Sequence, residues 1–130
     1  MASNKICVVV VSGTRERLQM AAMTASVAAV SGQEVMVFLS MNALPYFVKG
    51  HAAKAPNEGE MGQLMEGKNV PDFKTLFGQA AALGDAKIFP CSMAMDVLGV
   101  EPGEMESFIG EPTGLTRFLD EARDAQVWTF

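Results

Sequence analysis

The residues best suited to nucleophilic or acid–base chemistry are two cysteines, Cys7 and Cys91, and a single histidine, His51. Cys91 directly follows residues 86–90, a mostly apolar run that reads AKIFP and is predicted to be a strand. It precedes residues 92–98, which have the composition of a short helix. A cysteine at the start of a helix faces unpaired backbone N–H groups and the positive end of the helix dipole, and both favour the nucleophilic thiolate. Cys91 is therefore the candidate catalytic residue. The competing interpretation is a small apolar side chain that fills a gap in the core.

Cys7 and His51 are weaker candidates for a chemical role. Cys7 lies inside the β-branched run 6–11, where a buried core position is the simplest interpretation. If its strand is a parallel neighbour of the one before Cys91, Cys7 lies on the order of 13 Å from the carboxyl edge of the sheet, too far for a disulfide. His51 lies in a polar segment where a solvated side chain is expected, although it could reach Cys91 as an acid or base.

Cofactor and metal sites have little support in the sequence. The turn Ser12-Gly13-Thr14 resembles half of a phosphate-binding loop, but neither GxGxxG nor GxxxxGK[ST] is present. One histidine, two separated cysteines and scattered carboxylates do not form a metal-ligand pattern. We therefore expect no metal and no other cofactor. A nucleotide or small-ligand binder that uses the 12–14 turn remains the third hypothesis for function.

Composition and charge exclude several classes of partner. The chain has 130 residues and a net charge of −5, with no basic cluster, so we expect neither nucleic acid nor an anionic membrane surface as a partner. No stretch approaches the roughly 18 apolar residues of a membrane span, and the N-terminus lacks the pattern of a signal peptide. We expect a cytoplasmic protein with two free thiols. The apolar fraction of 49% and the ten methionines favour burial between subunits of a homo-oligomer.

The pattern of apolar residues alternates between strands and helices. It predicts strands at 6–11, 34–39, 86–90 and 126–130 with a weaker one at 105–109, and helices at 15–30, 42–48, 73–83, 92–98 and from 112 or 113 to 122. Residues 50–71 have no periodicity, and we expect a long mobile loop with a brief turn near 61–65. The resulting fold is a single α/β domain over residues 1–130, a three-layer sandwich around a mostly parallel sheet of about five strands. Reactive groups in such folds gather beyond the carboxyl ends of the strands, where Cys91 is placed.

Several segments resemble those of the DsrE/DsrF-like family, in the branch sometimes labelled peroxiredoxin-like. Residues 89–100 read FPCSMAMDVLGV, similar to the family's cysteine motif after a strand. In the same order as in the family, matching segments read VVSGT at 10–14, VMVFLSMNAL at 35–44, ALGDAKI at 82–88 and VWTF at 127–130. The resemblance covers nearly the whole chain.

This resemblance implies a Rossmann-like sheet, homo-oligomers that are often trimers or hexamers, and a persulfide carried on Cys91. Members of the family pass sulfane sulfur among rhodanese-like proteins, TusA-like carriers and complexes of sulfur oxidation or tRNA thiolation. The first hypothesis is therefore a sulfur carrier, and whether it also turns over as a sulfurtransferase stays open. The N–H groups at the helix start would stabilise the persulfide anion.

One departure from the family pattern affects the expected mechanism. Some members have a second cysteine upstream of the carrier cysteine, whereas this chain reads QAAA at residues 79–82. Without a nearby second thiol, sulfur cannot leave by forming an intramolecular disulfide, which favours relay to a partner thiol. The second hypothesis is an oligomeric partner-docking or regulatory subunit that uses no thiol chemistry.

Overall fold

The computed structural model describes residues 4–130, which form four strands, five α-helices and two short 3-10 helices among them. In chain order the elements are β1 (Lys5–Val10), α1 (Arg15–Val30), β2 (Glu34–Leu39), η1 (Met41–Phe47), α2 (Glu60–Glu66), α3 (Phe73–Gly84), β3 (Lys87–Pro90), α4 (Ser92–Leu98), η2 (Pro102–Glu104), α5 (Leu115–Glu121) and β4 (Gln126–Thr129).

The sheet has the strand order β3-β2-β1-β4, and every neighbouring pair is parallel. The central strands β1 and β2 are continuous apolar runs because both of their faces are covered, as is usual in parallel sheets. Parallel strands end at one common edge, and in this sheet Val10, Leu39 and Pro90 are paired at that edge. The predicted strand 34–39 is confirmed at both of its ends.

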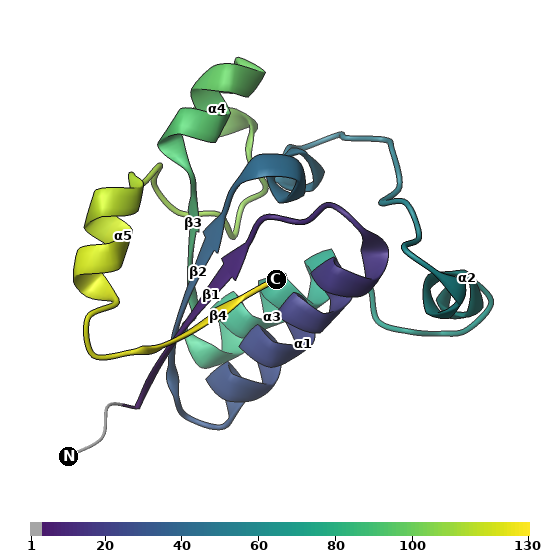
Figure 1. Ribbon diagram of the computed structural model, residues 1–130, viewed down its shortest axis with the longest axis horizontal. Coiled ribbons are helices and arrows are strands. Elements are labelled where there is room, and N and C mark those ends of the chain that lie inside the picture. The colour runs from purple at the N-terminus through teal and green to yellow at the C-terminus, as the bar shows by residue number, and fades with distance from the viewer. Residues whose placement is uncertain (1–3) are drawn as a thin grey trace.

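Helices cover the sheet on two sides, which confirms the predicted three-layer arrangement (Figure 1). Helices α1 and α3 pack together on one face, and Gly84 allows their close approach because a Cβ there would lie 2.4 Å from the Cβ of Ala29. On the other face, α5 places Phe118 against Phe38 of β2, with 4.9 Å between the ring centroids. The core lies in these two layers between helices and sheet.

The sheet has four strands rather than about five, because the strand predicted at 105–109 is wrong. Met105 makes a single isolated bridge to Val48. The chain instead approaches the free edge of β3 a few residues later, where Gly110 N–H donates to the carbonyl of Ile88 at 2.7 Å. Pro112 has no N–H to donate, so a continuous ladder cannot form along this edge.

In two other segments the structure differs in detail from the prediction. The helix expected at 42–48 is the 3-10 helix η1, which contains Pro45, a residue that cannot donate an intrahelical hydrogen bond. The predicted loop 50–71 contains α2, which extends the turn expected at 61–65 to a helix of seven residues. Figure 1 shows α2 set apart from the sheet, beyond the start of α1.

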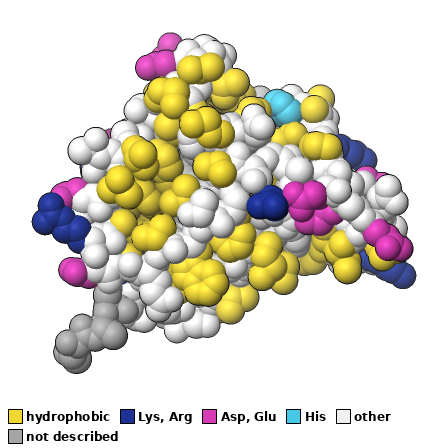
Figure 2. Space-filling view, viewed as in Figure 1, with side chains coloured by type: hydrophobic (Ala, Val, Ile, Leu, Met, Phe, Trp, Pro, Cys, Tyr) yellow, Lys and Arg dark blue, Asp and Glu magenta, His cyan; other side chains and the backbone are white. Residues whose placement is uncertain are grey.

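Apolar side chains also reach the surface. In Figure 2 they gather at the upper left, over the region of α4 and α5. The exposed apolar side chains of these two helices are Met93, Val97, Leu98, Leu115 and Leu119. Over residues 4–130, no helix combines the length and the hydropathy needed to cross a membrane.

Candidate functional site at the end of β3

Cys91 is the first residue after β3 and the N-cap residue of α4. Its backbone is extended, with φ −67° and ψ 121°, so the chain leaves the strand and turns directly into the helix. The predicted helix 92–98 is confirmed at both ends. It stops at Gly99, whose φ of 69° is a left-handed conformation that glycine adopts without steric cost.

The backbone around Cys91 is held from two sides. Its N–H donates to the carbonyl of Leu39 at 2.8 Å, which continues the β2–β3 pairing by one residue. On the other side, Thr113 N–H donates to the carbonyl of Pro90 at 2.9 Å, and Ser92 N–H donates to the carbonyl of Thr113 at 3.1 Å. Cys91 therefore lies between two extended segments that fix its main chain.

Thr113 is a part of this site that the sequence did not indicate. Thr113 is buried, and its hydroxyl donates to the carbonyl of Glu111 at 3.1 Å. It forms an isolated parallel bridge with Cys91. The only local signal was the Pro112-Thr113 pair, which we interpreted as a helix start, although α5 begins two residues later at Leu115.

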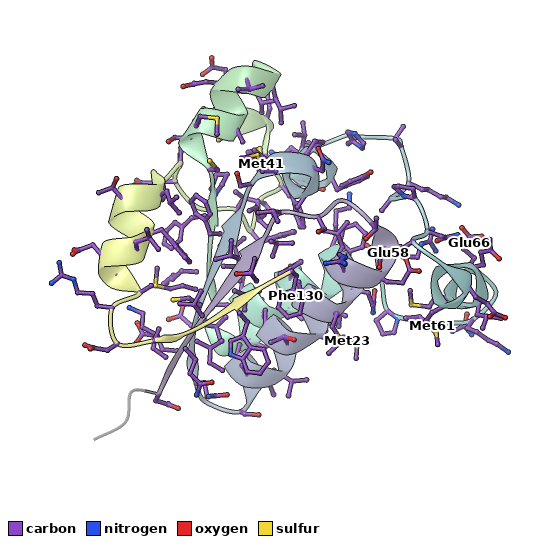
Figure 3. The ribbon with its side chains drawn as sticks, in the orientation of Figure 1. Met23, Met41, Glu58, Met61, Glu66 and Phe130 are labelled. Carbon is purple, nitrogen blue, oxygen red and sulfur yellow. The ribbon has the colours of Figure 1, made fainter. Side chains whose placement is uncertain are left out.

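Cys91 is only 6% exposed, and its side chain makes no capping hydrogen bond. Around this edge of the sheet, apolar side chains are exposed: Met93 and Val97 on α4, and Met41 at the start of η1. Figure 3 shows Met41 at the end of β2, on the side from which α4 extends. Cys91 thus lies nearly buried at an edge of the sheet that carries exposed apolar side chains.

Cys7 is a core residue, as the sequence predicted. It is completely buried in the middle of β1, and burial raises the pKa of its thiol. In register it pairs with Met36, which pairs with Lys87, four positions before Cys91. The two cysteines are thus offset by about 13 Å along the strands and by about 10 Å across them, and both are free thiols.

His51 lies in a different environment from Cys91. Its ring packs edge-on against Tyr46, with 5.2 Å between centroids, and it lines a pocket that Cys91 does not line. The structure thus does not bring His51 and Cys91 together in one cavity.

The turn Ser12-Gly13-Thr14 is occupied by protein contacts. A Cβ on Gly13 would lie 2.6 Å from the carbonyl oxygen of Asn42, so the glycine permits a close approach of η1. The first N–H of α1, on Arg15, donates to the carbonyl of Pro56 at 2.9 Å. The beginning of α1 therefore binds a segment of this same chain. Within residues 4–130, no group of three or more histidine, cysteine or carboxylate side chains is arranged to hold a metal ion.

Comparisons with known proteins show the family and the fold. The model of the DsrE/DsrF/DrsH-like family matches residues 51–130, which include Cys91 and more than half of the chain. The fold is similar to the crystal structure of the YchN protein from E. coli, with a TM-score of 0.65, 18% identity and 100% of both chains covered. It is also similar to MTH1491 from Methanobacterium thermoautotrophicum, titled a protein of unknown function, with a TM-score of 0.64 and 9% identity over 97% of this chain and 98% of that one. No curated protein matches the sequence significantly.

Proposed function

The chain belongs to the DsrE/DsrF/DrsH-like family, and from this premise we propose that it relays sulfane sulfur as a persulfide on Cys91. The observation that supports the proposal most strongly is the position of the two cysteines. Cys91 lies at the carboxyl edge of the parallel sheet, where ligands of α/β folds bind, whereas Cys7 is enclosed in the middle of the central strand.

The proposed relay consists of two thiol exchanges without net oxidation. The thiolate of Cys91 attacks the outer sulfur of a donor persulfide, a new S–S bond forms, and the donor leaves as a thiolate with the electron pair of the broken bond. An acceptor thiolate then attacks the outer sulfur on Cys91, and Cys91 leaves as the thiolate. The upstream segment 79–82 contains no cysteine, so the attacking thiol comes from a partner.

The surroundings of Cys91 suit protein partners better than small reactants. Cys91 is almost buried, and the neighbouring helix α4 and the helix α5 carry exposed apolar side chains. A docked protein can cover that surface and exclude water from the exchanging sulfurs. We propose rhodanese-like donors and TusA-like or sulfur-oxidation proteins as acceptors, the classes that the family resemblance implies.

The edge strand β4 supports a further proposal, a homo-oligomer, with a trimer or hexamer as the form that the resemblance implies. Val127 and Trp128 are each about half exposed, although they lie in a strand. Static light scattering on the purified protein tests this, and a monomer at micromolar concentration would contradict it. The two free thiols also support a cytoplasmic location.

Mass spectrometry tests the relay. The protein is incubated with a persulfidated rhodanese, and the matched variants are Cys91→Ala and Cys7→Ala. We expect wild type and Cys7→Ala to gain about 32 Da, one sulfur atom, and Cys91→Ala to gain none. A second incubation with an acceptor thiol protein should remove the added mass. Loading that persists in Cys91→Ala would contradict the proposal.

The burial of Cys91, together with the exposed apolar side chains of α4, favours a second candidate, a docking or regulatory subunit without thiol chemistry. On this hypothesis Cys91→Ala would keep both its assembly state and its function in a cellular complementation assay. Substitution of an exposed α4 residue, such as Val97→Asp, would abolish both. The relay instead predicts that Cys91→Ala loses its function in the same assay, although this variant keeps the apolar surface.

A further inference from the structure

We propose that a second site, the pocket between α1, η1 and the N-terminus of α3, binds a small aromatic carboxylate or sulfonate. The pocket has a volume of about 340 Å³ and is lined by residues from these three elements, from α2, and from the segments 51–55 and 70–74. This volume is at the lower end of small-molecule sites and suits a body of one or two rings. Cys91 does not line the pocket, so the proposal is independent of the sulfur relay.

The charges of the lining residues favour a single negative charge on the ligand. Three cations, Arg15, Lys54 and Lys74, line the pocket beside one acid, Asp72. The Asp72 carboxylate already accepts the N–H of Lys74 as the cap of α3. A ligand can pair only with a cation that is not already paired with an acidic side chain.

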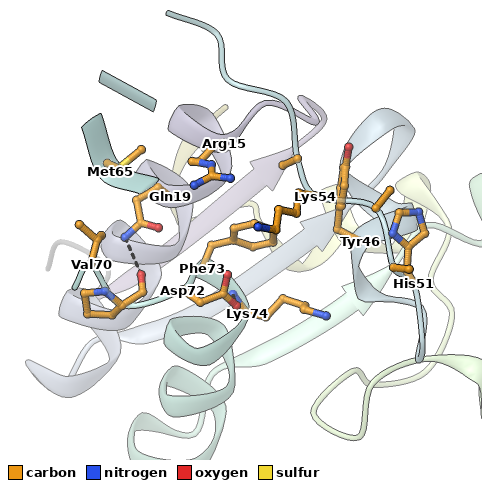
Figure 4. Close-up of a pocket in the computed structure, with 14 residues that line it drawn as sticks. Arg15, Gln19, Tyr46, His51, Lys54, Met65, Val70, Asp72, Phe73 and Lys74 are labelled. Atoms are coloured by element: carbon orange, nitrogen blue, oxygen red, sulfur yellow. Dashed lines mark hydrogen bonds between the residues drawn. The ribbon is translucent and has the colours of Figure 1, made fainter. Parts of the chain in front are cut away.

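Two of the three cations have acidic partners outside the pocket lining. Arg15 lies 3.3 Å from a carboxylate oxygen of Glu66, and Lys74 lies 3.4 Å from one of Glu106. For Lys54 the structure shows no ion pair within residues 4–130. Figure 4 shows the side chains of Arg15 and Lys54 entering the pocket from different segments. An anionic head group between them would meet one unpaired ammonium and the remaining donors of the guanidinium.

Aromatic rings form the wall on which the body of the ligand would lie. The rings of Tyr46 and Phe73 are perpendicular, with 6.3 Å between their centroids, and His51 packs edge-on against Tyr46. A flat ring packs well against such a wall, in offset or edge-to-face geometry. The Nδ1 atom of His51 is buried and has no hydrogen-bond partner among the described residues. A polar atom of a ligand would satisfy it.

The pocket is held open by contacts that do not involve the ligand. Gln19 is buried and donates from its side-chain amide to the carbonyl of Pro71 at 3.0 Å (Figure 4). This bond joins α1 to the segment that leads into α3. A preformed pocket loses little conformational entropy when a ligand binds.

Ligand binding in this pocket can be followed by NMR spectroscopy. The chain has one tyrosine and one histidine, Tyr46 and His51, and both line the pocket. Their ring signals in proton NMR spectra therefore report on this site without ambiguity. The probe is 2-naphthoate, and 2-naphthylmethylamine, with the same rings and a positive charge, is the matched control ligand.

We expect 2-naphthoate to shift both ring signals saturably at fixed pH, with a dissociation constant on the order of 1 mM or tighter. Lys54→Gln should weaken binding by about fivefold to tenfold, because it removes the charge that pairs with the ligand. Lys49→Gln is the control, since Lys49 is an exposed lysine outside the pocket lining. Unshifted ring signals, equal binding of the cationic analogue, or unchanged affinity in Lys54→Gln would each overturn the proposal.

Discussion

The carboxylate of Glu16 accepts a hydrogen bond from the backbone N–H of Gly59 at 2.7 Å, a contact between residues 43 positions apart. The same carboxylate accepts from the N–H groups of Glu58 at 2.8 Å and Gly62 at 3.1 Å. Gly59, the N-cap of α2, has no side chain to cap its own helix. Glu16 supplies the cap from α1, and the long segment between η1 and α3 is thereby attached to the rest of the fold.

Replacement of Glu16 by glutamine should loosen the first turn of α2 without unfolding the sheet. An amide has only one acceptor oxygen and no charge, so it cannot accept three N–H groups as the carboxylate does. We expect amide hydrogen exchange at Glu58, Gly59 and Gly62 to become several-fold faster, while exchange in β1 and β2 is unchanged. Glu60→Gln is the control, because Glu60 lies in the first turn of α2 and its side chain makes none of these contacts. Unchanged exchange at Gly59 in Glu16→Gln would contradict the capping role.

Acid should loosen the same turn of α2. The hydrogen bond from Glu58 N–H, followed by those from Gly59 and Gly62, holds the pKa of Glu16 below its ordinary value of 4.5. Because the folded pKa is the lower one, the stabilisation is complete above the ordinary value and is lost as pH falls through the folded value. Exchange at Gly59, corrected for its intrinsic pH dependence, should therefore accelerate only below about pH 4.5. In Glu16→Gln this acid-dependent step should be absent.

Thr113 should affect the proposed chemistry of Cys91 through its backbone rather than through its side chain. Thr113→Pro removes the N–H that donates to Pro90, at a cost of about 1–3 kcal/mol in unfolding free energy. We expect slower loading of sulfur on Cys91, since one of the two segments that fix its main chain is released. Thr113→Val keeps the backbone bond, so it should load at nearly the wild-type rate. Urea unfolding and the rate of mass gain measure the two effects, and equal loading rates in both variants would contradict this role.

Two glycines of α3 should respond oppositely to alanine. At Gly84 a Cβ would lie 2.4 Å from the Cβ of Ala29 and 2.7 Å from its carbonyl carbon, so Gly84→Ala should destabilise the fold by about 1–3 kcal/mol. At Gly78 the nearest atom is a ring carbon of Phe108 at 3.5 Å, an ordinary contact. Gly78→Ala should stabilise the fold by up to about 1 kcal/mol through helix propensity. Thermal unfolding measures both, and equal melting temperatures would show that α1 and α3 do not pack this closely.

Local sequence patterns were sufficient for the elements that depend on local interactions. The helix at 15–30 and the strand at 34–39 have the bounds that the pattern of apolar residues predicts. Asp72, a residue type that favours helix starts, caps α3, and its side chain accepts from Lys74 N–H. Each of these features is set by neighbours within one or two helical turns, and such signals are visible in the order of residues.

The predictions that differ from the structure concern segments without their own periodicity. Residues 105–109 look like a weak strand, but whether they pair depends on which edge they reach, and Pro112 prevents a ladder beside β3. Residues 50–71 have no periodicity, and the turn predicted at 61–65 is the longer helix α2, whose first turn is capped by Glu16, far away in the chain.

The sequence alone determined that Cys91 follows a buried strand and begins a helix, and that Cys7 lies within the core. Only the tertiary structure decided what surrounds Cys91: the carbonyl of Leu39 on one side, Thr113 on the other, and an exposed apolar surface on α4. It likewise placed His51 beside Tyr46 in a separate pocket. The physical reason is that hydrogen bonds between distant segments depend on how the chain closes its loops, and no short window of sequence contains both partners.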